Sequence, residues 1–364
     1  MLSDVPLAPR TTLGVGGRAR RLTRAALDGL PALVLDAARR GEPLLVLGGG
    51  SNLLIADAGH CGLAIELTAR GRTTQDEGEH VLVRAEAGHD WDDLVAWACR
   101  EDLAGIECLS GIPGRVGAAP MQNIGAYGQE VGESLVSVEA LHTETGERRL
   151  FSVADCELGY RTSRFKHREA GRWLVTAVTL RLLRHGAPAL RYAELTRRAH
   201  DELGGSPSLG QVRALVLAIR RAKSMVLDPE DADARSAGSF FTNPVVDEAA
   251  VDAVRAAARA RGIDGPVPAW PTAKGIKLAA GWLIDRAGYP PGWGDGPAGL
   301  SSKHALAIVN RGGATARDVV GVATRVRRGV RDAFGVHLIP EPVFVGFEAG
   351  PDPSAVLDAA EQDL

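Results

Sequence analysis

The chain has 364 residues, of which 45% are hydrophobic and 24% are charged, and its formal net charge is −3. This length and balance are typical of a globular protein with two or three domains and a large buried core. The charge argues against a nucleic-acid-binding protein, because no basic excess is present to neutralise phosphates. A few local Arg and Lys side chains can still hold small anions.

The N-terminus and the cysteines indicate a cytoplasmic protein. The first ten residues, MLSDVPLAPR, lack the apolar core of a signal peptide, and no apolar run approaches the length of a membrane span. The four scattered cysteines form no CxxC pair, which is typical of reduced, mostly buried thiols. They are Cys61, Cys99, Cys108 and Cys156. His60 precedes Cys61, but no second ligand pair has suitable spacing, so we expect no metal.

The first 128 residues mix helices, strands and a long irregular stretch. Residues 28–41 and 91–105 predict helices, and the first begins with an Asp and ends with a Gly. Apolar runs bounded by turn residues predict strands at 42–47, 62–67 and 80–88. Residues 53–57 form a further apolar segment, and 109–128 are irregular.

The pattern turns to strands from about residue 134 and then to helices. Residues 134–143 and 148–153 predict a hairpin, and 172–183 predict another strand. Helices are predicted at 210–224, at 247–262 with Asp247 as N-cap, at 277–288 and at 315–335. The last helix has an apolar stripe formed by Val319, Val322, Val326, Val330 and Phe334. Residues 336–346 predict a strand interrupted by Pro, and the acidic tail after 350 is expected to be loose.

These elements do not alternate as strict βα units, which favours α+β domains over one doubly wound sheet. A linker rich in Gly, Ser and Pro, GGSPSLG, places a domain boundary near 205–225. The sequence shows no internal repeat.

Glycine is abundant, with 44 residues, and it is clustered. The run Gly48-Gly49-Gly50-Ser51-Asn52 follows a predicted strand. Consecutive amides there can form a nest for an anion, while the alternative is a tight turn between strands. The run is no P-loop, because no Gly-Lys-Ser/Thr follows, and it is a poor dinucleotide fingerprint, because it does not open a helix.

The irregular stretch 109–128 contains five Gly and two Pro. A loop of this length is functional or disordered, and its low charge and its Ile, Val, Met and Tyr content argue against disorder. Such a backbone can lie against a large flat ligand, with Gln122 and Asn123 hydrogen-bonded to polar ring edges. The two glycine-rich loops together suggest a ligand with a diphosphate and an extended aromatic ring.

Five ordered motifs resemble the UDP-N-acetylenolpyruvoylglucosamine reductase family over about residues 10–347. They are GGGSNLL, GIPGRVGAAPMQNIGAYGQEV, GYRTSRFK, AGSFFTNPVV and LIPEPVFVG. The resemblance implies a cytoplasmic, FAD-dependent oxidoreductase of peptidoglycan precursor synthesis, and hence of cell wall biogenesis, cell shape and cell division. It implies that NADPH reduces the enolpyruvyl ether of UDP-N-acetylglucosamine to UDP-N-acetylmuramate.

The resemblance also implies the architecture. The fold class is α+β, with a two-lobed FAD-binding region of the vanillyl-alcohol oxidase type and a third, α/β substrate-binding domain. The expected boundaries are 1–68 and 69–208 for the FAD-binding lobes, 209–349 for the substrate-binding domain and 350–364 for a tail. Tyr192 in LRYAELTRR resembles the form of the family with a substrate-capping tyrosine loop, here near 187–200.

Three residues carry the chemistry that the resemblance implies. Arg161 would bind the substrate carboxylate through two hydrogen bonds, and Glu341 would help to stabilise the enolate-like intermediate, for which it must carry a proton. Ser239 would protonate the α-carbon, with Gly238 bringing the hydroxyl close and the two following Phe residues fixing the turn in the core. Read alone, each has a structural alternative: a surface salt bridge, an exposed strand end and a packed turn.

The motifs also imply the binding residues. The expected FAD contacts are Gly48, Gly49, Gly50, Ser51, Asn52, Leu53, Gly111, Pro113, Gly114, Gly117, Ala118, Gln122, Asn123, Gly125, Ala126 and Tyr127. The expected substrate contacts are Tyr160, Lys166, Tyr192, Lys223 and Asn243. NADPH is expected to use the substrate pocket first. No His lies in these motifs, so we expect FAD to be bound without a covalent link.

Two positions depart from the family pattern. Thr11-Thr12-Leu13-Gly14 stands where the family commonly has Asn-Thr, so a contact from Asn is lost, and Arg115 occupies a position that is more often small. Arg115 contacts the cofactor phosphates or points to solvent. Rival hypotheses are an FAD-dependent oxidase that uses oxygen and a flavin or UDP-sugar binding module without turnover. We expect a monomer with small-molecule partners and neither nucleic acid nor membrane.

Overall fold

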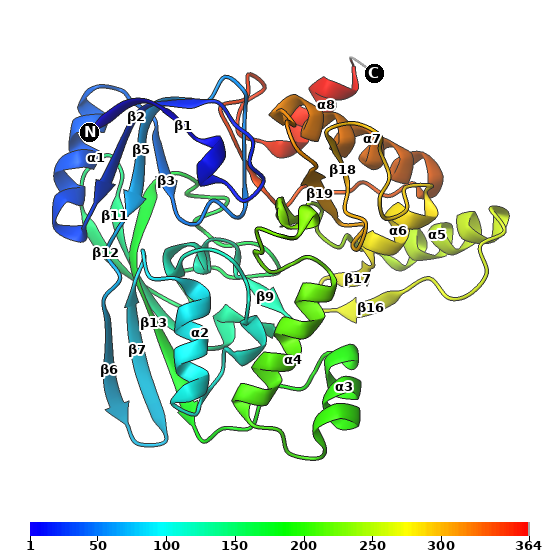
Figure 1. Cartoon of the computed structure of the whole chain (residues 1–364), viewed down its shortest axis with the longest axis horizontal. Helices are drawn as coiled ribbons and strands as arrows, with labels where there is room; N and C mark the ends of the chain where they lie inside the picture. The colour runs from blue at the N-terminus through cyan, green and yellow to red at the C-terminus, as the bar shows by residue number, and fades with distance from the viewer. Residues whose placement is uncertain (363–364) are drawn as a thin grey trace. The chain divides into compact units, whose positions relative to one another are not determined.

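The computed structural model describes residues 1–362, which form two compact units (Figure 1). Unit 1 comprises residues 1–5, 19–49 and 61–226, and unit 2 comprises residues 6–18, 50–60 and those from 227 onward. The chain therefore passes between the units several times, and each unit draws on segments that are distant in the sequence.

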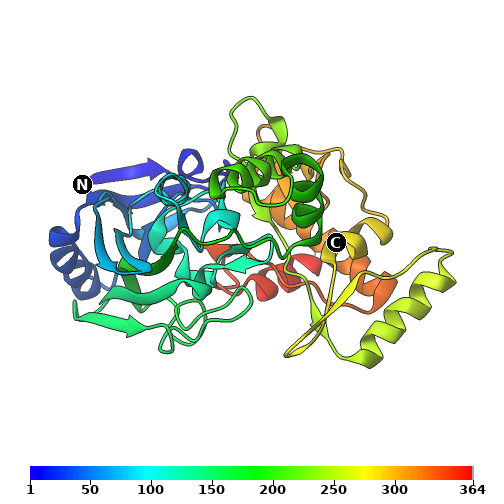
Figure 2. The same cartoon turned by 90° about the horizontal axis from the view of Figure 1, so that it is seen from below.

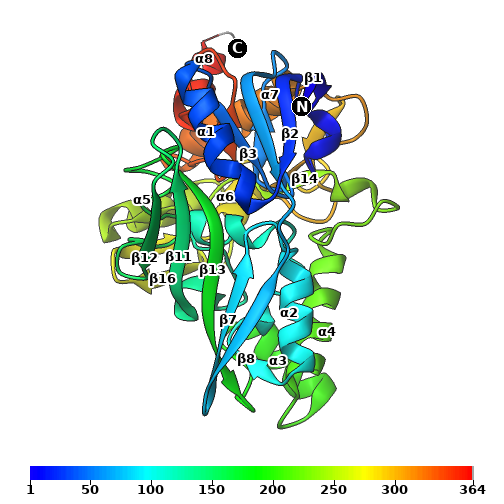
Figure 3. The same ribbon diagram turned by 90° about the vertical axis from the view of Figure 1, so that its left-hand side faces the viewer.

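The first sheet of unit 1 has the strand order β1-β2-β5-β3. Its strands are β1 (Leu2–Pro6), β2 (Arg18–Ala25), β5 (His60–Leu67) and β3 (Leu44–Leu47). Helix α1 (Leu30–Arg39) buries Leu30 and Val34 against Leu63 of β5, and Figure 3 shows the helix beside this sheet. The helix and strands expected here are confirmed.

The second sheet of unit 1 is antiparallel, with the order β12-β11-β13-β7-β6, and β8 also pairs with β13. Its strands are β6 (Arg72–Glu77), β7 (His80–Glu86), β8 (Leu103–Ala104), β11 (Leu135–His142), β12 (Arg148–Ser152) and β13 (Trp173–Arg184). The hairpin of β11 and β12 is confirmed. Strand β6 was not predicted. All six of its residues are exposed and polar, so its sequence lacks the alternation of apolar and polar residues that indicates a strand.

Three helices complete unit 1. They are α2 (Trp91–Arg100), α3 (Ala193–Leu203) and α4 (Leu209–Ala222), and Figure 1 shows them near one another. Helices α3 and α4 bury Leu195, Val216 and Ile219 in a common cluster. Helix α2 ends at Arg100, five residues earlier than predicted, because the chain turns into β8. The segment 187–200, expected as a capping loop, contains most of α3.

Unit 2 holds two three-stranded antiparallel sheets and one parallel strand pair. The sheets are β14 (Ser236–Ser239), β19 (Ala307–Asn310) and β18 (Ala298–Leu300), and β15 (Val245–Val246), β17 (Gly275–Leu278) and β16 (Ala269–Thr272). Strand β20 (Val343–Val345) pairs with β4 (Leu53–Ile55). Figure 2 shows the yellow hairpin of β16 and β17 beside the yellow-green helix α5 (Glu248–Ala260).

The helices of unit 2 surround one apolar core. Helix α7 (Ala316–Phe334) buries the whole predicted stripe, including Val326 and Val330, against α5 and α6 (Ala280–Arg286). The Asp247 side chain accepts a 2.8 Å hydrogen bond from the Ala250 amide, so the predicted N-cap of α5 is confirmed. The strand predicted at 336–346 is shorter in the structure, because only Val343–Val345 are paired as a strand.

The prediction of a loose acidic tail is wrong for the residues that the structure describes. Helix α8 (Pro353–Glu361) is capped by the Asp352 side chain and buries Leu357 completely. Arginines of α7 pair with its acidic residues: Arg331 Nη2 lies 2.5 Å from Glu361 Oε1, and Arg327 Nη2 lies 2.8 Å from Asp358 Oδ1. The acidic residues are thus neutralised by a basic helix. Residues 363–364 lie outside the described part.

None of the helices within residues 1–362 combines the length and the apolar character needed to cross a membrane.

Candidate active site

Within unit 1, Gly48 and Gly49 at the start of the first glycine-rich loop lie directly against the second loop. A Cβ placed on Gly49 would lie 2.7 Å from the Cα of Gly114, so the backbones touch at a distance that no side chain would allow. Gly117 is equally confined, because its Cβ would lie 2.6 Å from the Cβ of Ala87. Gly48 is different: it is exposed, and the nearest atom to its Cβ would be 3.6 Å away on Arg115. The protein therefore leaves room at Gly48 that it does not leave at Gly49.

Contacts with helix α2 help to order the loop 109–128, whose own regular structure is limited to short elements. The Asp92 carboxylate accepts a 2.6 Å hydrogen bond from the Gly111 amide and also pairs with Arg213 of α4. Burial raises the pKa of Asp92, but the bonds from Arg213 and the Gly111 amide outweigh it, so the pKa lies below its usual value. Arg115, whose role the sequence left open, forms an ion pair of 3.1 Å with Asp90.

Arg161 lies at the tip of a tight turn. Gly159 and Thr162 pair with each other through two backbone hydrogen bonds, which leaves Tyr160 and Arg161 between them. Arg161 has a φ of +53°, a left-handed conformation that costs a residue with a side chain about 1–2 kcal/mol. Its guanidinium donates to the carbonyl of Gly125 at 2.6 Å and to that of Asn123 at 3.4 Å. Arg161 is thereby tied to the second glycine-rich loop.

The neighbouring polar residues of this loop are engaged by protein groups. The Asn123 side chain is 3% exposed and bonds to Glu130, to the amide of Gly132 and to the carbonyl of Gly159. The Asn123 side chain is therefore engaged in hydrogen bonds within the protein. The Gln122 Oε1 accepts a 3.2 Å hydrogen bond from Lys166 Nζ, which joins two residues expected in different sites.

An aromatic and charged cluster surrounds Tyr192. The Tyr127 and Tyr192 rings meet edge to face with centroids 5.5 Å apart. Lys223 ends α4 and forms a 2.8 Å ion pair with Glu194, which lies two residues after Tyr192. Burial raises the pKa of Tyr127 to about 12, and Arg220 hydrogen-bonds to its hydroxyl. The predicted residues Tyr127, Tyr192 and Lys223 are thus neighbours in unit 1, and the sequence had not singled out Glu194 or Arg220.

In unit 2, an irregularity in strand β14 precedes Ser239. Ser236 pairs with Val309 and Ser239 with Ala307, so two residues of β14 oppose one residue of β19. Gly238 within this bulge has a φ of +75°, where glycine is favoured. Phe240 and Phe241 follow with exposures of 0% and 2%, and their rings pack edge to face. The two rings fix the backbone after Ser239 in the core, as the sequence predicted.

The segment that carries Glu341 pairs with the segment that carries Ser239. The amide of Glu341 donates a 2.8 Å hydrogen bond to the carbonyl of Phe240, and the amide of Thr242 donates to that of Ile339. The first glycine-rich loop reaches the same region, because the carbonyl of Asn52 accepts from the Val343 amide at 2.9 Å. Within unit 2 the structure therefore brings together the backbones beside Ser239, Glu341 and Asn52.

The side-chain oxygen of Asn243 has a structural role. Its Oδ1 accepts a 2.9 Å hydrogen bond from the amide of Ala280, the first residue of α6. Its side-chain oxygen therefore caps a helix.

The cysteines are four free thiols, of which Cys108 and Cys156 are buried. Burial raises the pKa of Cys108 to about 12 and that of Cys156 to about 11, so both are protonated at neutral pH. Among residues 1–362, no three His, Cys, Asp or Glu side chains are grouped so that they could hold a metal ion.

Two family models match separate parts of the chain. Residues 26–151 match the FAD binding domain, and residues 228–345 match the C-terminal domain of UDP-N-acetylenolpyruvoylglucosamine reductase. The first match includes both glycine-rich loops, and the second includes Ser239 and Glu341. The predicted α+β fold class with an FAD-binding region and a separate C-terminal domain is confirmed.

Relatives that align with most of this chain are named UDP-N-acetylenolpyruvoylglucosamine reductase. The UDP-N-acetylenolpyruvoylglucosamine reductase of Thermobifida fusca is 47% identical over 94% of this chain and 97% of its own length, and that of Nocardia farcinica is 48% identical over 94% and 89%. The crystal structure of the Thermus caldophilus reductase aligns with a TM-score of 0.63 and 27% identity, over 95% of this chain and 99% of that one. The chain therefore belongs to the UDP-N-acetylenolpyruvoylglucosamine reductase family.

Proposed function

We propose that this protein catalyses the NADPH-dependent reduction of the enolpyruvyl ether of UDP-N-acetylglucosamine to UDP-N-acetylmuramate, in peptidoglycan precursor synthesis. The observation that carries this proposal is the pairing of the Phe240 carbonyl with the Glu341 amide, which fixes two of the three proposed catalytic residues beside each other. Membership of the family supports the choice of substrate.

The reaction adds a hydride to the terminal carbon of the enol ether and a proton to its α-carbon. FAD, held by the two glycine-rich loops, would supply the chemistry of hydride transfer between NADPH and the substrate. The electron pair of the double bond moves to the α-carbon and its carboxylate, where negative charge builds up. Arg161 would bind this carboxylate, and Glu341 would donate a hydrogen bond to it.

Ser239 would complete the reaction by protonating the α-carbon. A hydroxyl is a weak acid, but a carbanionic carbon is a strong enough base to take its proton. The proton moves from Oγ to the α-carbon, and the alkoxide that remains takes a proton from solvent. The bulge at Gly238 and the buried rings of Phe240 and Phe241 support this role, because they restrict the position of the hydroxyl.

The two touching glycine-rich loops fit a ligand with a diphosphate and a flat ring. Backbone chain without side chains can approach such a ligand closely and turn its amides toward phosphate oxygens. We assign the FAD contacts to Gly48–Leu53 and to the ten residues from Gly111 to Tyr127 that the sequence predicts, with Asn123 contributing through its backbone.

Gly48→Ala is expected to weaken FAD binding by about 10- to 100-fold, because an added methyl group would occupy space that the ligand needs. The protein itself tolerates the change, since the nearest atom to the new Cβ lies 3.6 Å away. A fluorescence titration of the apoprotein with FAD measures the effect. Gly29→Ala is the matched control, because a Cβ there would meet no other atom within 4 Å. Unchanged FAD affinity in Gly48→Ala would remove Gly48 from the cofactor site.

We assign Tyr192, Lys223 and Asn243 to the nucleotide diphosphate, and Tyr160 and Lys166 to support of the reacting end. Lys223 pairs with Glu194, so a diphosphate competes with that carboxylate for the ammonium group.

Glu194→Gln is expected to tighten the binding of UDP by about two- to fivefold, since an ion pair that is one-third exposed is worth about 0.2–1 kcal/mol. Isothermal titration calorimetry with UDP measures the change. Glu202→Gln on the same helix removes a carboxylate that pairs with Arg198, and it should leave the affinity unchanged. Equal or weaker binding in Glu194→Gln would exclude Lys223 from the diphosphate site.

A visible spectrum of the purified protein tests the whole proposal. We expect a bound flavin, bleaching by anaerobic NADPH, and recovery of the colour when the enolpyruvyl sugar is added. Rapid recovery in air without the sugar would favour an oxidase, and a flavin that NADPH does not bleach would favour a binding module. We further propose a cytoplasmic monomer in which NADPH and the sugar use one pocket in turn.

A further inference from the structure

The left-handed turn at Arg161 is held at two points by one residue, Asn123. The Asn123 side chain binds the turn at the Gly159 carbonyl, and the Asn123 carbonyl accepts from the guanidinium of Arg161. A strained conformation persists only where its surroundings determine it, so the direction of the guanidinium depends on the placement of Asn123. Asn123 is itself left-handed, with a φ of +47°.

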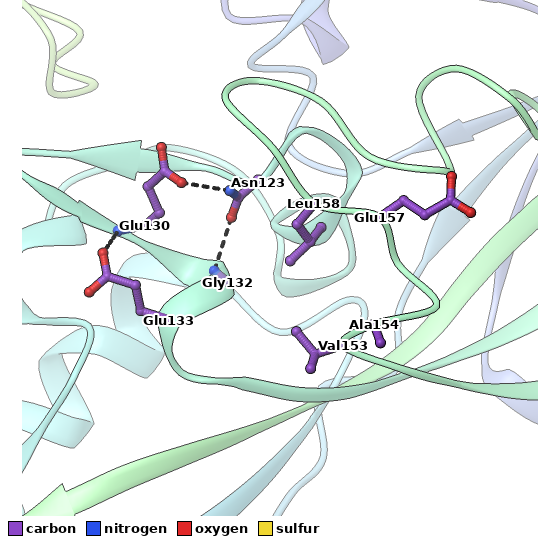
Figure 4. A pocket seen from close by; sticks show the side chains of 8 residues that line it. All are labelled: Asn123, Glu130, Gly132, Glu133, Val153, Ala154, Glu157 and Leu158. Carbon is purple, nitrogen blue, oxygen red and sulfur yellow. Dashed lines mark hydrogen bonds between the residues drawn. The ribbon is translucent and has the colours of Figure 1, made fainter. Parts of the chain in front are cut away.

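The orientation of the Asn123 amide is fixed by its partners. The Gly132 amide can only donate, so the atom 2.9 Å from it must be the side-chain oxygen. The nitrogen therefore faces the two acceptors, Glu130 Oε2 at 2.7 Å and the Gly159 carbonyl at 3.2 Å. Figure 4 shows Asn123 between Glu130 and Gly132. Glu130 supplies the charged acceptor in this network.

Glu130 and Arg161 also share Gly125. Glu130 lies opposite Gly125 in the two-stranded sheet of β9 (Gly125–Ala126) and β10 (Gln129–Glu130). A Cβ on Gly125 would lie 2.8 Å from Glu130 Cγ and 3.1 Å from Arg161 Nη1, so both side chains pack on this glycine. The position of the Glu130 stem therefore limits where the guanidinium can lie.

We propose that Glu130 is a positioning residue for Arg161, acting through Asn123 and Gly125. This inference rests on the proposed function, in which Arg161 binds the substrate carboxylate. A displaced Asn123 nitrogen would release the Gly159 carbonyl and with it the turn. The guanidinium of Arg161 would then no longer hydrogen-bond to both oxygens of the substrate carboxylate. The rest of the nucleotide sugar would bind as before.

The pocket beside Glu130 allows this side chain to be shortened without creating a buried cavity. It has a volume of about 450 Å³ and includes Glu130, Glu133 and Glu157 in its lining. Because this space is open and partly lined by carboxylates, a shorter side chain at position 130 leaves room that water can fill and not an empty cavity. Glu157 lines the same pocket but pairs with Arg164 and Arg168, and Figure 4 shows it pointing away from Asn123.

The experiment compares the affinities of the full-length variants for two sugars by calorimetry. UDP-N-acetylmuramate carries the carboxylate, and UDP-N-acetylglucosamine lacks it. Glu130→Asp, one methylene shorter, is expected to weaken binding of the first about tenfold and to leave the second unchanged. In single-turnover assays it is expected to slow reduction of the enolpyruvyl sugar by about 10²-fold per bound flavin, the cost of a misplaced group. Glu130→Gln, which keeps an oxygen for Asn123, should recover both properties, and Glu157→Asp is the control.

Three results overturn the proposal. If Glu130→Asp loses affinity for both sugars alike, Glu130 serves the fold in general. If it loses affinity for neither, Glu130 does not position Arg161. If the wild-type protein does not distinguish the two sugars, the assignment of Arg161 to the carboxylate fails, and the positioning role fails with it. Only the last result concerns the proposed function, so the two failures can be told apart.

Discussion

Ser239→Ala is expected to lower the rate of sugar reduction by about 10²–10⁴-fold, the usual contribution of a placed acid. Bleaching of the bound flavin by NADPH should continue at the wild-type rate, because that step uses no proton from Ser239. Stopped-flow measurement of the two half-reactions separates these effects in one preparation.

We expect Ser239→Ala to affect only sugar reduction because backbone contacts in unit 2 fix the position of residue 239. The bulge at Gly238 precedes it, and the carbonyl of Phe240 accepts from the Glu341 amide directly after it. These contacts are backbone contacts, so removal of one hydroxyl leaves them in place. The loss of rate should therefore come from the missing proton and not from a displaced turn.

Thr242→Val is the matched control for Ser239→Ala. It removes a hydroxyl three residues further on, which bonds to the Ile339 carbonyl at 3.4 Å. We expect both half-reactions to remain as in the wild type. An equal loss in both half-reactions of Ser239→Ala would contradict the role of proton donor.

The sequence predicted the elements whose side chains alternate or repeat clearly. The stripe on α7 and the hairpin of β11 and β12 are such cases, because one face of each is buried and apolar. Helix α8 was missed because its acidic residues suggest a solvated tail. Their partners, Arg327 and Arg331, lie on α7 about 30 positions earlier, and no local pattern reveals such a pairing.

For the candidate site, too, the sequence predicted some features and missed others. The resemblance of five ordered motifs to the family was sufficient to select Arg161, Ser239 and Glu341 as catalytic candidates, and they remain proposals. The direction in which a side chain points could not be predicted from the sequence, because it depends on the backbone dihedral angles. Asn123 has a φ of +47°, which turns its amide toward Glu130 and Gly132. Ion pairs between distant residues, such as Lys223 with Glu194, were hidden for the same reason.

Arg161→Lys is expected to lower the rate of sugar reduction by about 10²–10³-fold, the usual effect of losing a donor to developing negative charge. The positive charge remains, but an ammonium group cannot present a planar fork to a carboxylate. It also cannot keep the bonds that the guanidinium makes with the carbonyls of Gly125 and Asn123 while facing a ligand. Bleaching of the flavin by NADPH should be unaffected. Arg168→Lys, at an exposed guanidinium paired with Glu157, is the control.

The steady-state constants of Arg161→Lys separate binding from catalysis. If Arg161 bound the carboxylate equally well throughout the reaction, its loss would raise KM and leave kcat unchanged. Negative charge spreads onto the carboxylate as hydride arrives, so the fork should bind the transition state more strongly than the substrate. We therefore expect kcat to fall together with kcat/KM. An increase in KM alone would make Arg161 a substrate-binding residue and leave the stabilisation of the enolate to Glu341.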